Sequence, residues 1–105
     1  MLRVEFNHDG NGALTVRLQG RLVSAYADDA RITLERYKLA PSFVVDLSEV
    51  TFVDSLGEQV LLWLGRLGAT FAVENVYTHS LCERLQLRIS DKQSGFVSGA
   101  ESKVL

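Results

Sequence analysis

The chain has 105 residues, of which 47% are hydrophobic and 23% are charged, as expected for one globular domain with a single core. The formal net charge is -2, and Lys and Arg are scattered along the chain, which disfavours nucleic acid as a partner. Cys82 is the only cysteine, so the chain alone cannot form an internal disulfide or a thiolate zinc site. We expect Cys82 to be a small buried apolar residue rather than a reactive thiol.

The sequence contains no segment that resembles a membrane anchor. The N-terminal sequence MLRVEFNHDG lacks an apolar signal region, and no stretch approaches the roughly 20 apolar residues that span a bilayer. We therefore expect a cytoplasmic protein without direct membrane insertion.

The first predicted elements are two strands, residues 2–6 and 14–19, in which apolar and polar side chains alternate. The residues between them, NHDGNG, tolerate the backbone conformations of turns, so the pair predicts an antiparallel hairpin. Gly20 is expected to close the second strand.

A helix is predicted in the segment ADDARITLERYKLAP, opening at Asp28 and Asp29 and ending before Pro41. Its predicted core face holds Ala27, Ala30, Leu34 and Tyr37. Residues 43–47 then form a short, nearly all-apolar run that is typical of a central strand buried on both faces. We expect this strand to pair in parallel with residues 14–19.

The second half of the chain predicts another helix, strand and helix. The helix covers residues 55–67, the strand residues 70–76, and the last helix residues 78–87, with Thr78 or Ser80 as its N-cap. The predicted core stripe of the first of these helices consists of Leu56, Val60, Trp63, Leu64 and Leu67.

Taken in order, these elements predict a mixed α/β fold, with a four- to five-stranded mixed sheet and helices packed mainly on one face. Residues 1–90 form the expected domain. Residues 91–105 form a tail with at most one short strand and an end that we expect to be disordered.

The most informative stretch is FVVDLSEVTFVDSLGEQVLLWL, residues 43–64, in which polar residues interrupt an apolar run. Ser55 and Glu58 have the spacing of a capping box, and this role explains both residues without any function. Gly57 is unfavourable in a helix, but it would leave the helix start bare for another surface. On that interpretation Gly57→Arg should spare folding and block a partner.

This stretch, preceded by LTVRLQGRL and followed by GATFAVENV, resembles a STAS domain over about residues 2–90. STAS domains occur in bacterial anti-sigma factor antagonists, in stressosome proteins and at the cytoplasmic ends of sulphate transporters. The resemblance implies a non-catalytic module, without a cofactor or metal, that binds a protein through the start of its second helix. Here that region corresponds to Asp54, Ser55, Leu56, Gly57 and Glu58.

Two positions depart from the family: Val23, where the antagonists often carry an acid, and Leu56. The antagonists are phosphorylated on the residue just before the motif glycine, which here is Leu56. The resemblance therefore implies signal transduction and transcription regulation through an anti-sigma factor or serine kinase, without the usual phosphoacceptor hydroxyl. Ser55 is a candidate displaced phosphosite, but the role of helix cap is favoured because it accounts for this serine fully.

Two further alternatives remain open for the protein's role. Lone STAS proteins also dock onto the ATPase subunits of ABC-type phospholipid transporters, so an accessory transport subunit is the second hypothesis, and a homodimer is compatible with either.

Leu61 and Leu62 widen the apolar stripe beyond one core face and predict an interface ridge.

A small serine hydrolase is the third hypothesis. Ser55 would be its nucleophile, with His79 or His8 and Asp46 or Asp54 as partners. Val53 stands where a nucleophile elbow needs glycine, which disfavours this hypothesis. The two histidines also lack metal-ligand spacing.

Overall fold

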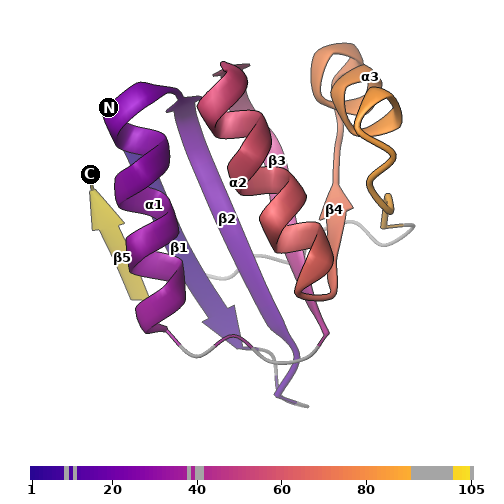
Figure 1. The fold of residues 1–105 in the computed structure, drawn as a ribbon. Coiled ribbons are helices and arrows are strands. Elements are labelled where there is room, and N and C mark those ends of the chain that lie inside the picture. Colours follow the sequence, from indigo (N-terminus) through magenta and orange to yellow (C-terminus); the bar gives the residue numbers. More distant parts are fainter. Residues whose placement is uncertain (9, 11, 38, 40–41, 91–100, 105) are drawn as a thin grey trace.

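The computed structural model describes residues 1–8, 10, 12–37, 39, 42–90 and 101–104. Its elements are β1 Leu2–His8, β2 Leu14–Leu22, α1 Ser24–Arg36, β3 Phe43–Val53, α2 Ser55–Arg66, β4 Ala69–Ala72, α3 Val76–Arg84 and β5 Glu101–Val104. The strands form one five-stranded sheet in the order β4-β3-β2-β1-β5. Figure 1 shows α1 and α2 side by side over one face of this sheet, with α3 beyond the β4 edge. The predicted mixed α/β class, with helices mainly on one face, is confirmed.

The predicted hairpin is present. β1 and β2 pair antiparallel from Leu2 opposite Gly20 to His8 opposite Leu14. β2 does not end at Gly20, as the sequence had indicated, but continues to Leu22 through a change of register against β3. Gly20 has a φ of 111°, which glycine adopts without strain, and the chain then returns Leu22 to the core with none of its surface exposed.

β3 is an interior strand, parallel to both β2 and β4, so its predicted central position is confirmed. It runs for 11 residues, well beyond the predicted residues 43–47. Val45 and Leu47 are fully buried, as an apolar run between two neighbouring strands requires. The C-terminal end of β3, at Val53, is followed by Asp54 and then by the first residue of α2.

α2 begins at Ser55, as predicted, but α1 and α3 begin at different residues from those predicted. α1 starts at Ser24, so Asp28 and Asp29 lie beyond its first turn. α3 starts at Val76, and its N-cap is Asn75, whose side chain accepts a hydrogen bond from the Thr78 amide at 2.8 Å, rather than Thr78 or Ser80. α1 begins earlier than predicted because only Val23 separates it from β2, whereas α3 begins earlier because Asn75, three residues beyond β4, supplies its cap.

The core-facing stripe of α2 also differs from the prediction. Leu56 and Leu67 are exposed, whereas Leu61 is fully buried. The buried residues of α2 are Gly57, Val60, Leu61 and Leu64. The helix is therefore rotated relative to the predicted stripe, because its first turn places glycine, rather than leucine, against the sheet.

The two edges of the sheet are paired differently. β5 adds to β1 in antiparallel register, and it is the short strand expected in the tail. Beyond β4, the Phe71 amide donates to the Arg88 carbonyl and the Ser90 amide donates to the Phe71 carbonyl, both at 2.8 Å. The end of the tail, which we expected to be disordered, includes β5 at residues 101–104, whereas residues 91–100 and 105 lie outside the described residues. Among the residues that are described, no helix combines the length and apolar character needed to span a bilayer.

Candidate functional site

The chain between β3 and α2 is organised by the carboxylate of Asp54. Its Oδ1 accepts a hydrogen bond from the Gly57 amide at 2.9 Å, and its Oδ2 accepts one from the Ser24 amide at 2.8 Å. Gly57 lies in the first turn of α2, and Ser24 is the first residue of α1. One side chain therefore accepts a hydrogen bond from an otherwise free amide at the start of each helix.

These hydrogen bonds correct the predicted capping box. Asp54, not Ser55, is the N-cap of α2, and Ser55 is an exposed first helical residue. The Glu58 carboxylate does not return to the helix start but forms a two-pronged ion pair with Arg84 of α3, with N···O distances of 2.7 and 3.3 Å. The serine hydroxyl is therefore not needed to cap the helix.

The same contacts set the charges of the two acids. The Gly57 amide, followed by the Ser24 amide, lowers the pKa of Asp54 below its ordinary value, and only partial desolvation opposes this. The Arg84 guanidinium similarly lowers the pKa of Glu58. Both carboxyl groups are therefore ionised near neutral pH.

Gly57 is buried, in contrast to the bare helix start that the sequence had indicated. A Cβ at this position would overlap the Leu22 carbonyl oxygen and lie 2.7 Å from Cγ1 of Val53. The first turn of α2 thus packs directly against the ends of β2 and β3, which only glycine permits. The expectation that Gly57→Arg would spare folding is wrong, because arginine cannot occupy this space.

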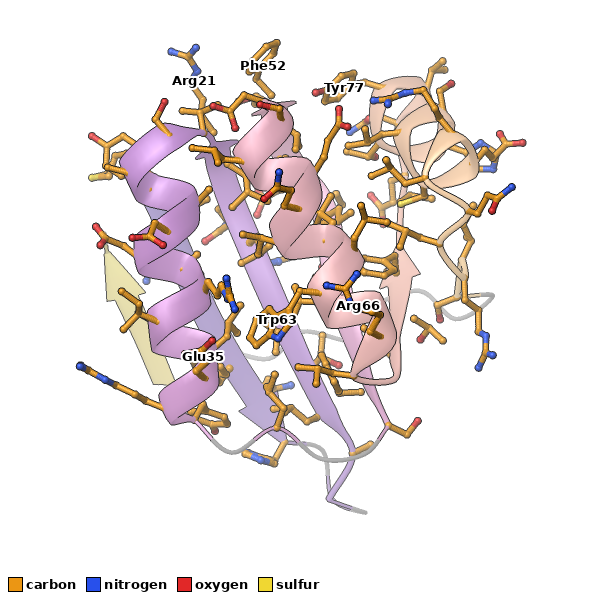
Figure 2. The ribbon with its side chains drawn as sticks, viewed as in Figure 1. Arg21, Glu35, Phe52, Trp63, Arg66 and Tyr77 are labelled. Atoms are coloured by element: carbon orange, nitrogen blue, oxygen red, sulfur yellow. The ribbon has the colours of Figure 1, made fainter. Side chains whose placement is uncertain are left out.

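Leu56 is the most exposed apolar residue of α2, with 48% of its surface accessible. It lines a groove of about 570 Å³ between α1 and α2, at the end nearest the start of α2. The predicted ridge of Leu61 and Leu62 is only half present, because Leu61 belongs to the core while Leu62 is partly accessible and lines the groove. Figure 2 shows Trp63 in the seam between the two helices.

The sequence did not predict a second exposed apolar cluster, which lies at the same end of the molecule as Asp54. The rings of Phe52 and Tyr77 stack with their centroids 6.5 Å apart, and Arg21 lies over Phe52 with its Cζ 5.7 Å from the ring centroid (Figure 2). The Tyr77 hydroxyl accepts a hydrogen bond from the Val53 amide at 2.8 Å. A signal was present in the sequence, since Phe52 occupies an outward position beside buried Val53, but no pattern indicated Tyr77 as its partner.

The residues of the hydrolase hypothesis are engaged in other interactions. His79 Nδ1 lies 2.7 Å from a Glu83 oxygen, and the carboxylate of Asp46 lies 3.3 Å from Arg17. The other histidine, His8, lies at the end of β1, where its ring centroid is 6.0 Å from that of Tyr37. These interactions do not bring a histidine to Ser55.

Two other expectations concerned metal and thiol chemistry. Within the described part of the chain, no group of three His, Cys, Asp or Glu side chains is placed to hold a metal ion. Cys82 is fully buried, as predicted, and burial raises the pKa of its thiol to about 11. The thiol is therefore protonated near neutral pH and is a poor nucleophile.

No protein-family model matches the chain. No curated protein matches it at a significant level.

Proposed function

We propose that this protein is a non-catalytic protein-interaction module of the STAS type, related to the anti-sigma factor antagonists. Its partner is an anti-sigma factor or serine kinase, which it meets in the cytoplasm. The proposed binding surface consists of the accessible residues at the start of α2: Asp54, Ser55, Leu56 and Glu58. Gly57 lies between this surface and the sheet, and its lack of a side chain allows the first turn of α2 to pack closely against Leu22.

The observation that carries the proposal is the exposure of Leu56 at the first turn of α2. A leucine that is half accessible loses water contact when a partner covers it, which contributes on the order of 1 kcal/mol to binding. Because Asp54 ties this turn to α1, the turn is already ordered, and a partner need not order it on binding. This combination favours recognition over catalysis.

Leu56 also occupies the position at which the resemblance implies phosphorylation. A leucine has no hydroxyl, so we propose that the complex is not released by the phosphoserine switch of the family. Ser55 is exposed and is not engaged as the cap, so it is the nearest alternative acceptor.

The proposal can be tested by photo-crosslinking in the source cell with a benzophenone amino acid at Leu56. The matched control places the same group at Ile32 of α1, which is 39% exposed and does not line the groove. We expect a specific crosslink from Leu56 to an anti-sigma factor or kinase and none from Ile32. Equal products from both positions would contradict the proposal, whereas an ABC-type ATPase crosslinked from Leu56 would favour the accessory transport subunit.

A second experiment addresses the switch. The purified kinase identified in this way, incubated with ATP and the protein, should leave the protein largely unphosphorylated. Mass spectrometry measures the result directly. Stoichiometric phosphate on Ser55 would show that the switch is displaced by one residue rather than lost.

A further inference from the structure

The groove between α1 and α2 has an apolar floor and charged ends. The starts of both helices bind the same Asp54 carboxylate, and the helices lie side by side, so they run parallel (Figure 1). The groove is lined by Ser24, Ala25, Asp28, Arg31, Leu56, Gln59, Val60, Leu62, Trp63 and Arg66. Apolar side chains from α2 thus form much of the lining, while polar and charged residues from both helices surround them.

The spacing of the lining residues along α2 suits a helical ligand. Leu56 and Trp63 are seven residues apart on α2, which is two helical turns, and Arg66 follows one turn later. The groove therefore offers contacts along about 15 Å, the length over which a bound helix presents side chains at i, i+3 or i+4, and i+7. Trp63 gives the floor a large rigid surface of the type that dominates binding energy at interfaces.

The charges of the groove are unevenly distributed. Arg66, in the last turn of α2, is exposed and has no ion-pair partner within the described part of the chain. Arg31 pairs with Glu35 at 3.1 Å and lies over Trp63, with its Cζ 5.5 Å from the ring centroid (Figure 2 labels Glu35 and Trp63). The Trp63 end is therefore basic, whereas Asp28 lies nearer the start of α1.

We propose that this groove binds an amphipathic α-helix of the protein partner, with apolar side chains against Leu56, Leu62 and Trp63 and an acidic side chain beside Arg66. The inference rests on the proposed function and specifies the kind of partner segment that the module recognises. The acid follows from charge complementarity, because a basic partner residue at Arg66 would be repelled.

The test uses Trp63, the only tryptophan of the chain, as the reporter of occupancy. A display library of helical peptides about four turns long, randomised on one face, is selected against the full-length protein. We expect enriched peptides to carry apolar residues at i, i+3 or i+4, and i+7, with Asp or Glu near one end. Titration of a selected peptide should shift the Trp63 emission to shorter wavelength with a saturable curve.

A matched pair of charge reversals isolates the role of Arg66. Arg66 and Arg36 are the basic residues in the last turns of α2 and α1, so Arg66→Glu and Arg36→Glu disturb the helix ends similarly. Only Arg66 lines the groove. Arg66→Glu should weaken binding of the acidic peptide about tenfold. The same variant should bind well to a second peptide in which Lys replaces the acid. Arg36→Glu should change the affinity for neither peptide by more than about twofold.

Several results would overturn the inference: no enriched helix, enriched helices without an acid, equal effects of the two reversals, or binding that leaves Trp63 emission unchanged. A Trp63 shift that depends on protein concentration alone would assign the groove to a second copy of the chain. The Leu56 crosslink is an independent measurement. If it identifies the partner while Arg66→Glu binds that partner normally, the groove inference fails and the proposed function stands; if no partner is found from Leu56, the proposed function itself fails.

Discussion

The two helices that cover the sheet begin at the same carboxylate, but they acquire their N-terminal caps in different ways. α2 is capped locally, because Asp54 accepts from the Gly57 amide three residues further on. α1 follows Val23, which provides no side-chain cap, and its Ser24 amide bonds instead to Asp54, 30 positions away in the sequence. The comparison shows that one helix start is encoded by neighbouring residues, whereas the other exists only once β2 and β3 have paired.

The largest expected effect comes from removing the close approach beneath the α2 start. Gly57→Ala places a Cβ against the Leu22 carbonyl and Val53, neither of which can move without disturbing a strand end. We expect a loss of about 3 kcal/mol in the free energy of unfolding, measured by urea denaturation.

Gly65→Ala is the matched control, because it makes the same substitution in the same helix. Its Cβ would meet Cδ2 of the Leu87 side chain at 3.0 Å and Cε2 of Phe71 at an ordinary 3.9 Å, and alanine favours a helix more than glycine. The stability of this variant should stay within about 1 kcal/mol of wild type. Equal losses for the two variants would show that Gly57 is not specially constrained.

A smaller change separates the two caps. Asp54→Asn retains one carbonyl oxygen, which can still accept from the Gly57 amide, but its NH2 group cannot accept from the Ser24 amide. Amide hydrogen exchange should therefore accelerate at the start of α1 much more than at the start of α2. Acceleration of equal size at both helix starts would mean that the two caps are not independent.

The smallest expected effect is an acid dependence of the shared cap. The folded pKa of Asp54 lies below its ordinary value of 3.8, so its contribution to stability is complete well above pH 3.8 and is lost as pH falls through the lower folded pKa. Urea denaturation of wild type and Asp54→Asn should show a clear stability difference near pH 6 that shrinks near pH 3. A difference that is constant with pH would show that the charge of Asp54 does not matter.

β1 and β2 were predicted well because their signal is periodic and local. The strand predicted over residues 70–76 was placed less well, because β4 covers only Ala69–Ala72 and Val76 already begins α3. The alternation of Leu2, Val4 and Phe6 against polar neighbours defines one buried face of β1, and the structure buries all three residues. The apolar run that contains Val45 and Leu47 similarly predicted an interior strand. Alternation of apolar and polar residues indicates which side chains are buried, and this can be read from the sequence without knowing which residues they pack against.

The candidate site was predicted only in part. Asp54, Ser55 and Leu56 do lie together at an accessible helix start, but the sequence assigned the cap to Ser55 and left Gly57 open to a partner. Leu61 was also predicted to be part of a ridge and is instead in the core. These errors share one origin, since the rotation of α2 depends on how closely its first turn approaches the sheet.

The sequence by itself determined the order of strands and helices, the burial of their alternating faces and the position of the α2 start, because these depend on residues close together in the chain. Only the tertiary structure decided that Asp54 accepts hydrogen bonds from the starts of two helices, that Gly57 packs between the site and the sheet, and that Trp63 lines a groove. Each of these features depends on where a distant group lies: the Ser24 amide, the Leu22 carbonyl or the neighbouring helix. Hydrogen bonds and steric contacts act over a few ångströms in space, so a linear pattern cannot specify them until the sheet has brought the segments together.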